Sequence, residues 1–361
     1  MTLAATAAIG LGVALARTGE ERRTAGRRRR KAGSLGLGRD EALAEGLRRM
    51  ALEQADVVIG RLASVEEDDA RRAVHEARKA IKRLRTIIRL LEGELGRRGC
   101  SREQDALRAV ASLLAGARDA EVMLNTLEGL VSRHPGKLAG KAGVAALRLH
   151  LAHERDDAER RVLEPGNRLR VSDELRLFRG RAASWQLPER PGAVAVEEGL
   201  QRVYRQGRKR FRRAAGRKGG RARTMHQWRK RVKDLRYSAE VLQRDATKVR
   251  PVGKSSRAAA AARAEAKWLR RLGKRADALG EVLGEEHDLA VLGEWIAEHG
   301  AGVGVGGATR RRLLKLIARR RTKLRRSALR AGRELYGRSP GRFVRRAARA
   351  YRRSSPALSR R

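Results

Sequence analysis

The segment HEARKAIKRLR, residues 75–85, decides the fold. On a helix that advances about 100° per residue, its basic and apolar side chains fall on two adjacent arcs. The basic arc, about 80° wide, contains His75, Arg78, Lys82, Arg85 and Arg89. The apolar arc contains Ala77, Ile81, Leu84, Ile88 and Leu91. The segment therefore predicts an amphipathic helix that buries one face and presents a row of cations beside it.

The same pattern recurs in MHQWRKRVKDLRY, residues 225–237, where His226 follows His75 at an offset of 226 − 75 = 151 residues. The basic arc of this second copy contains His226, Arg229, Lys233 and Arg236. Matches flank both copies in the same order: Glu45-Gly46-Leu47 with Glu198-Gly199-Leu200 upstream, and Leu114, Asp119 and Val122 with Leu283, Asp288 and Val291 downstream. Ordered matches of this kind predict a tandem duplication. The second copy has Glu240 in place of Arg89, which predicts an internal ion pair at that end.

The composition predicts an all-α fold. Alanine, leucine and arginine dominate, aromatic residues make up 3% of the chain, and runs of β-branched residues are few, which favours helices over sheets. The 41% of hydrophobic residues is enough for a buried core. Breaks that contain glycine or proline, at 134–140, 185–192, 250–262 and 299–307, are predicted to separate the helices.

Four segments are predicted along the chain. Residues 1–38 are expected to form a basic, disordered N-terminal segment, whose apolar opening is shorter than the roughly 20 residues of a membrane-spanning helix. Residues 39–184 and 193–351 are expected to form two helical halves, and 352–361 a basic tail. No membrane partner is expected.

The charge of the chain predicts a polyanionic partner. The sequence has 86 Lys and Arg against 41 Asp and Glu, a formal net charge of +45, and so many like charges repel one another unless a polyanion is near. The candidates are nucleic acid, an anionic membrane surface and inorganic polyphosphate. Cys100 is the only cysteine, which excludes an intramolecular disulfide and a thiolate zinc site and fits a reducing, cytoplasmic location.

Rows of basic side chains suit phosphate recognition. Arginine holds phosphate oxygens through a flat bidentate fork, and lysine holds them as a point charge. A third row, with spacing i, i+3, i+7 and i+10, consists of Arg202, Arg205, Lys209 and Arg212. One basic row is usually a solvated face, but its recurrence in the duplicate favours a binding site. One four-helix bundle per half would bring the rows together as a basic groove.

The histidines do not predict a metal site. No cluster of His, Asp or Glu at metal-ligand spacing surrounds His75 or His226, and the nearby cations are expected to keep both neutral. His287-Asp288 invites comparison with metal phosphohydrolases, but the first copy has Arg118-Asp119 there. Asp119 and Asp288 are therefore predicted to be buried partners of basic groups, with Arg118 and His287 as structural residues beside them. No metal or cofactor is expected.

These motifs resemble the CHAD domain, named for conserved histidines in an α-helical domain. The signature of this family begins each half with H-x-x-R-[VK]-x-x-[RK]-x-L-R, which is similar to HEARKAIKRLR and MHQWRKRVKDLRY. A short R-D-x-x-V motif follows later in each half, and it is similar to ARDAEV and EHDLAV. The resemblance covers residues 39–351. It implies two tandem four-helix bundles related by internal pseudo-two-fold symmetry, with a basic groove or pore between them that binds inorganic polyphosphate.

The resemblance also implies which residues contact the anion: His75, Arg78, Lys79, Lys82, Arg85, His226, Arg229, Lys230, Lys233 and Arg236. The basic rows add Arg89, Arg202, Arg205, Lys209 and Arg212 to this set. Two positions depart from the pattern, because His287 stands where the family commonly has arginine and Asp234 stands where the first copy has Arg83. Weaker binding by the second half is therefore expected.

The expected function is non-catalytic binding of polyphosphate in the cytoplasm, at polyphosphate granules. Some members of the family are fused to a catalytic CYTH triphosphate-tunnel domain, but this chain lacks the alternating strands and the E-x-E-x-K-like segment of such a tunnel. Nucleic acid is the alternative partner, although aromatic side chains for base stacking are scarce and no recognition motif is present. An enzyme would need paired carboxylates or a triad, and the basic rows supply neither.

Overall fold

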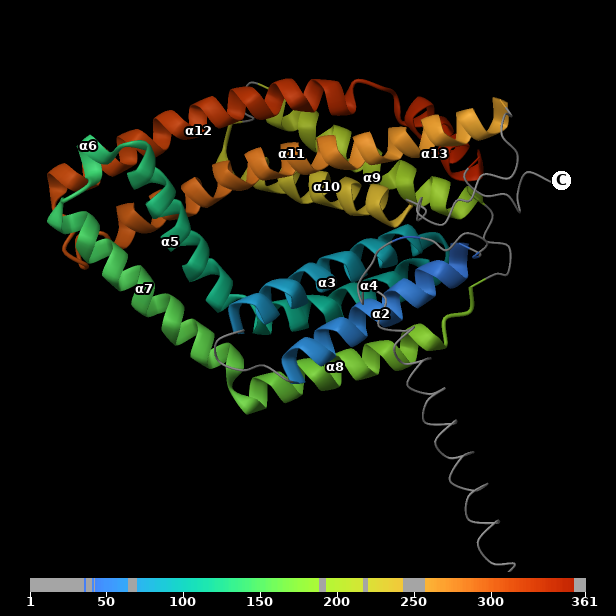
Figure 1. Ribbon diagram of the computed structural model, residues 1–361, viewed down its shortest axis with the longest axis horizontal. Helices are drawn as coiled ribbons and strands as arrows, with labels where there is room; N and C mark the ends of the chain where they lie inside the picture. The colour runs from blue at the N-terminus through green and yellow to red at the C-terminus, as the bar shows by residue number, and fades with distance from the viewer. Residues whose placement is uncertain are drawn as a thin grey trace, which may run out of the picture. The chain divides into compact units, whose positions relative to one another are not determined.

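In a computed structural model of the chain, the described residues are 36, 41, 43–63, 70–187, 193–216, 220–242 and 257–353. They form helices, and this described part contains no strand, which confirms the predicted all-α class (Figure 1). The helices in chain order are α2 (Leu43–Ala63), α3 (Ala70–Leu90), α4 (Glu92–Leu113), α5 (Gly116–Arg133), α6 (Pro135–Leu138), α7 (Ala142–Leu163), α8 (Pro165–Ala183), α9 (Ala193–Ala215), α10 (Ala222–Val241), α11 (Arg257–His299), α12 (Gly307–Tyr336) and α13 (Pro340–Arg353).

Two sets of four helices pack around the larger hydrophobic core. In the first set, α2 and α4 each contact both α3 and α8. In the second set, α10 and α13 each contact both α9 and α11. Apolar side chains from both sets, such as Leu84 of α3 and Leu235 of α10, belong to one continuous core. These contacts do not establish two four-helix bundles related by a pseudo-two-fold axis, so that arrangement stays a prediction.

A second core joins α5 and α7 to α11 and α12. It contains Leu127 of α5, Leu147 of α7, Leu292 of α11 and Leu313 of α12, all fully buried. Both cores therefore take side chains from both predicted halves, and the described helices all belong to one unit. The long α11 contributes to each core, which holds the two regions together (Figure 1).

The predicted breaks differ in how well they match the helix ends. The break at 299–307 is confirmed, because α11 ends at His299 and α12 begins at Gly307. The break at 134–140 contains the short helix α6, which has Pro135 in its first turn, where a missing N–H costs nothing. The predicted loop 250–262 is wrong in its second part, because α11 already begins at Arg257. Residues 258–262 are all alanine, the residue type with the highest helix propensity, which favours this earlier start of α11.

The predicted terminal segments are mostly outside the described residues. Of the N-terminal segment 1–38 only Gly36 is described, and of the tail 352–361 only the first two residues, which end α13. The break at 185–192 is described as far as Leu187, and those three residues are not helical. The division into halves at this break stays a prediction.

Gly199 explains why a Glu-Gly-Leu motif begins the second copy. Built on the backbone of Gly199, a Cβ atom would lie 2.7 Å from the carbonyl oxygen of Leu90. This distance is shorter than van der Waals contact, so only glycine lets α9 approach the end of α3 this closely. The packing of α9 on α3 therefore depends on the absence of a side chain at residue 199.

A fully buried carboxylate attaches α12 to α11. Glu286 of α11 has no exposed side-chain surface, and its Oε1 accepts hydrogen bonds from Arg321 at 3.1 Å and Arg325 at 2.8 Å. Such a buried acid is tolerated because two guanidinium groups compensate its charge. These contacts orient α12 on its neighbour and determine which of its side chains face outward.

Candidate anion-binding site

Three arginines of the first basic row, on α3, contact neighbouring elements. Arg78 Nη1 donates to the carbonyl oxygen of Leu114 at 2.5 Å, and Arg85 Nε donates to Gln104 Oε1 at 3.1 Å. Arg89 Nη1 donates to Asp234 of α10 at 2.7 Å. These side chains are thus partly buried, and only part of the predicted row faces solvent.

The remaining members of the α3 row are more accessible. His75 and Lys82 are exposed, and Lys79 is half-buried with its Nζ 3.6 Å from Glu76 Oε1. A single helix thus presents exposed basic groups next to arginines fixed by polar contacts. Fixed arginines lose little further freedom when an anion binds, because their geometry is set before binding.

The second basic row, on α10, packs against α11 through ion pairs. Lys233 Nζ lies 2.7 Å from Glu281 Oε1, and Arg236 Nη1 lies 2.9 Å from Asp277 Oδ1. The guanidinium of Arg229 lies against Gly284, where an added Cβ would be 3.2 Å from Nη2. Two of the predicted anion contacts in this half, Lys233 and Arg236, therefore already have carboxylate partners.

Two ion pairs join α3 to α10. Arg83 Nη2 lies 2.8 Å from Glu240 Oε1, and Arg89 Nη1 lies 2.7 Å from Asp234 Oδ1. The internal ion pair predicted from Glu240 is confirmed. With the offset of 151 residues, Asp234 matches Arg83 and Glu240 matches Arg89. Arg83 therefore pairs with the counterpart of Arg89, and Arg89 pairs with the counterpart of Arg83. A two-fold axis between two copies of one helix produces reciprocal pairing of this kind.

Cations of both basic segments lie beside these ion pairs. We call this region the α3–α10 seam; it contains Arg83, Arg85 and Arg89 of α3 and Lys230, Asp234 and Glu240 of α10. Burial and the neighbouring Arg231 and Arg85 lower the pKa of Lys230, which is exposed on α10. Burial and the neighbouring Arg89 and Arg108 lower the pKa of Arg85 on α3. Arg85 of the first copy therefore lies close enough to Lys230 of the second to disfavour its charge. An anion at the seam would reverse this effect.

His226 and His287 form a pair of neutral imidazoles at the contact between α10 and α11. Their ring centroids are 4.0 Å apart. Burial lowers the pKa of His226 to about 4, with further contributions from His287, Lys230 and Arg229. Burial, Arg229, Lys230 and Arg321 lower the pKa of His287 to about 4. The predicted neutrality of His226 agrees with these values. Among the described residues, no group of three or more His, Cys, Asp or Glu side chains is placed to hold a metal ion.

The two aspartates of the short downstream motifs are less buried than predicted. Asp119 has 68% of its side chain exposed, so the prediction of a buried acid is wrong there, although its Oδ1 lies 3.9 Å from Arg78 Nη2. It is exposed because it lies in the first turn of α5, beyond the packed face of that helix. Asp288 is half-buried. The side chain of Arg118 lies outside the described residues.

The third predicted row, on α9, is mostly exposed. Arg202 lies 3.6 Å from Glu92 and 3.8 Å from Glu198, measured between side-chain nitrogen and oxygen atoms. Arg205, Lys209 and Arg212 are exposed, and within the described residues they form no ion pair with a carboxylate. The C-terminal part of α9 is therefore a cationic face.

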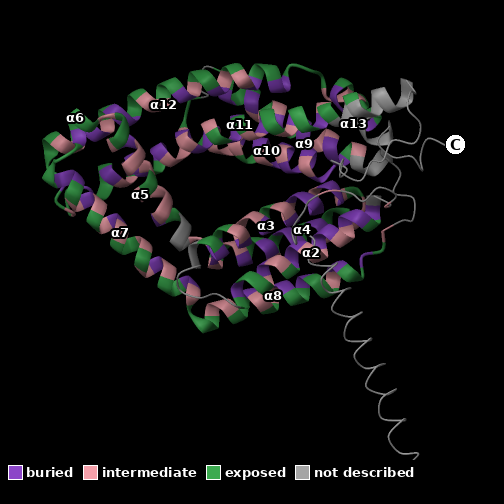
Figure 2. Ribbon diagram, in the orientation of Figure 1, coloured by how far each residue is buried: buried purple, intermediate pink, exposed green. Residues whose placement is uncertain are grey.

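A longer cationic row on α12 was not among the predicted site residues. Figure 2 shows α12 alternating between buried and exposed positions, as an amphipathic helix does. Its exposed face carries seven cations within an arc of about 80°: Arg312, Lys315, Arg319, Lys323, Arg326, Arg330 and Arg333. Considering described residues only, none of the seven forms an ion pair with a carboxylate. The spacing by three and four residues is visible in the sequence, but the row lies outside the duplicated motifs from which the site was predicted.

The fold and these surfaces define an all-helical protein whose repeated basic segments meet in space. The chain belongs to the CHAD domain family, whose model matches residues 41–297. The chain is also similar to the crystal structure of the CHAD domain from the plant Ricinus communis, with 22% sequence identity and a TM-score of 0.55. That match covers 83% of this chain and 94% of the plant chain, and it shows a shared fold. No protein with a curated description matches the chain.

A membrane span requires a helix that is both long and apolar. Within the described residues, no helix combines the length and the apolar composition needed to cross a bilayer.

Proposed function

We propose that this chain binds inorganic polyphosphate without catalysing its hydrolysis. The observation that carries the proposal is the contact between α3 and α10, which brings the two CHAD-like basic segments side by side through the pairs Arg83–Glu240 and Arg89–Asp234 and places Arg85 near Lys230. Like charges held together in this way favour a polyanion that neutralises them. Membership of the CHAD family, in which the resemblance implied polyphosphate binding, supports the same ligand.

In this proposal, two four-helix bundles, one of α2, α3, α4 and α8 and the other of α9, α10, α11 and α13, are related by a pseudo-two-fold axis near the α3–α10 seam. The reciprocal pairs Arg83–Glu240 and Arg89–Asp234 support such an axis. The polyphosphate chain contacts the accessible cations beside the seam. The rows on α9 and α12 extend the cationic surface, which suits a linear anion of many charges.

The same site supports binding rather than catalysis. The carboxylates near the basic rows, Asp234, Glu240, Asp277 and Glu281, lie 2.7–2.9 Å from lysine or arginine side chains. A carboxylate held by a cation is a weak general base, because the cation stabilises its charged form. These acids therefore act as charge partners that hold the helices together. We place the protein in the cytoplasm, at polyphosphate granules.

Competition between polyphosphate and RNA tests the proposal against its main alternative. At equal phosphorus concentration, long-chain polyphosphate should displace a fluorescent polyphosphate probe at a much lower concentration than RNA does. Stronger displacement by RNA would favour a nucleic-acid-binding protein. Orthophosphate release from polyphosphate, measured with added magnesium or manganese, should not exceed that of a protein-free control. Release that scales with protein concentration would contradict a binding-only function.

A further inference from the structure

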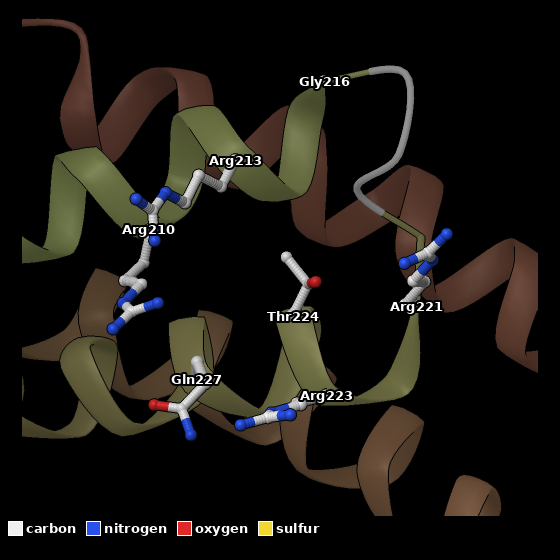
Figure 3. Close-up of a pocket in the computed structure, with 7 residues that line it drawn as sticks. All are labelled: Arg210, Arg213, Gly216, Arg221, Arg223, Thr224 and Gln227. Carbon is white, nitrogen blue, oxygen red and sulfur yellow. The ribbon is translucent and has the colours of Figure 1, made fainter.

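A pocket lies where α9 ends and α10 begins. It has a volume of about 450 Å³, and its lining residues are Arg210, Arg213, Gly216, Arg221, Arg223, Thr224 and Gln227. Figure 3 shows Arg210 and Arg213 on α9, and Arg223, Thr224 and Gln227 on the facing part of α10. Arg221 is the residue that precedes α10. The pocket is thus formed by two consecutive helices of the second half.

No acidic side chain among the described residues that line the pocket compensates its charge. Four of its lining side chains are arginines and none is acidic. Within the described part of the chain, none of these four guanidinium groups forms an ion pair with a carboxylate. This differs from the α3–α10 seam, where Arg83 and Arg89 have carboxylate partners. The four guanidinium groups carry the same charge, so an anion in the pocket would be attracted by each of them.

The other lining groups also suit an anion. The N-cap residue of α10, Arg221, makes no side-chain capping hydrogen bond, and the helix dipole adds positive potential at this end. Thr224 and Gln227 supply neutral hydrogen-bond donors. No aromatic side chain lines the pocket, so a nucleobase would find no stacking surface there.

The pocket lies near the first turns of α10, and the α10 residues of the seam lie farther along the same helix. At a rise of about 1.5 Å per residue, Arg223 precedes Lys230 by about 10 Å and Asp234 by about 16 Å along the helix axis. A ligand in the pocket therefore contacts residues that the polyphosphate proposal does not use. The volume suits a small ligand rather than a long chain, since small-molecule sites begin at about 300 Å³.

We propose that this four-arginine pocket is a separate binding site for a compact anion of two or three linked phosphoryl groups. Each arginine can hold two phosphate oxygens through its planar fork, and a triphosphate offers enough oxygens for all four. Free inorganic oligophosphate and the triphosphate tail of a nucleotide share this chemistry. The inference does not depend on binding of long-chain polyphosphate at the seam.

Calorimetric titration of the full chain with inorganic triphosphate tests the site. The test variant is Arg210→Ala with Arg223→Ala, which removes one guanidinium from each wall. The matched control is Arg97→Ala with Arg98→Ala, two exposed arginines of α4 that have no carboxylate partner among the described residues. The pocket variant should bind triphosphate at least tenfold more weakly than the parent, while the control should stay within about twofold, because only the pocket variant removes charged hydrogen-bond donors from the site. Equal losses in both variants, or no binding of triphosphate by the parent, would overturn the proposal.

Further arms identify the source of the anion and guard against misfolding. ATP that binds as tightly as triphosphate supports the site and includes nucleotide tails among its ligands, whereas exclusion of ATP supports the site and limits it to inorganic oligophosphates. Gln227→Glu adds a carboxylate to the pocket without removing an arginine, and it should weaken triphosphate binding in the same direction. Unchanged triphosphate affinity in folded Gln227→Glu would contradict the site. Long-chain polyphosphate that fails to bind while triphosphate binds would refute the proposed function and leave this site standing.

Discussion

Arg89 of α3 donates to Asp234 of α10 at 2.7 Å, and Asp234 stands at the position that Arg83 occupies in the first copy. Both side chains are largely buried, with 20% and 10% of their surfaces exposed. We therefore expect Asp234→Ala to lower the free energy of unfolding by about 3 kcal/mol, since it leaves a buried guanidinium without its partner. Urea unfolding of Arg89→Ala, Asp234→Ala and the double variant measures the coupling, expected at about 1–2 kcal/mol. Strict additivity would contradict a stabilising pair.

Removing one exposed cation from α3 and one from the seam should weaken polyphosphate binding. Lys82 of α3 and Lys230 of α10 are both exposed, so Lys82→Ala with Lys230→Ala should leave the helical circular dichroism unchanged. The affinity for long-chain polyphosphate should fall about tenfold or more, because contacts to charged groups contribute about 1.5–3 kcal/mol each. Arg97→Ala with Arg98→Ala removes the same charge from α4 and should have a much smaller effect. Equal affinities of the seam variant and the parent would show that the seam is not the binding site.

The α12 row should appear in the salt dependence of binding. Neutralising Lys315, Lys323 and Arg330 with alanine keeps the helix, because alanine has the highest helix propensity. If these residues bind the anion, the slope of log affinity against log salt should decrease in magnitude by about 0.7 for each phosphate that the variant no longer neutralises. Affinities of parent and triple variant, measured over a series of salt concentrations, provide the two slopes. An unchanged slope would place the anion elsewhere on the protein.

The histidine pair predicts a loss of stability in mild acid. The folded pKa values of His226 and His287 are about 4, below the ordinary value of 6.5. Between these two values the unfolded chain binds more protons than the folded chain, so the free energy of unfolding should fall as the pH falls through 6.5 towards 4. Above this window the pair should contribute no pH dependence.

Replacing one member of the pair tests this assignment. In His226→Gln, the fall of the denaturant midpoint between pH 6.5 and pH 4 should be smaller than in the parent, because one titrating group with a depressed pKa is gone. His153→Gln is a suitable control, because that histidine is exposed, with 72% of its side chain accessible. The same pH dependence in the parent and in His226→Gln would exclude the pair as its cause.

The close approach of α9 to α3 predicts a specific sensitivity at Gly199. In Gly199→Ala, the new Cβ would lie 2.7 Å from the carbonyl oxygen of Leu90, a backbone atom that cannot move aside as a flexible side chain could. The cost should be about 1–3 kcal/mol, as for other overpacked sites. Gly180→Ala in α8 is the control, since nothing lies within 4 Å of its added Cβ and alanine favours the helix by about 1 kcal/mol. Thermal unfolding should therefore shift in opposite directions for the two variants.

The amphipathic helices and the repeat could be predicted from the sequence because both depend on local spacing. HEARKAIKRLR and MHQWRKRVKDLRY are each within one helix, with Ile81, Leu84, Val232 and Leu235 buried as their arcs predict. The short helix α6 and the start of α11 at Arg257 could not be predicted from the glycine and proline breaks, because residues beside these breaks are still helical.

The contacts and exposure of individual charged side chains could not be predicted, because they depend on contacts between distant segments. Arg78 and Asp119 illustrate this, since one is held by the carbonyl of Leu114 and the other is exposed in the first turn of α5. Periodicity identifies a face but does not tell which carboxylate another helix will bring to it. The α9–α10 pocket likewise depends on how two helix ends meet, although its four arginines are close in sequence.

The reciprocal pairs between α3 and α10 also determine what the halves can associate with. Two identical first-copy helices meeting in the same way would place Arg83 against Arg89 twice, and both meetings would be repulsive. Two acidic residues, Asp234 and Glu240, both in the second copy, make both meetings attractive. In these pairs the first copy therefore contributes the cations and the second copy contributes the anions. This contact therefore disfavours pairing between the first copies of neighbouring chains, because their arginines would repel one another.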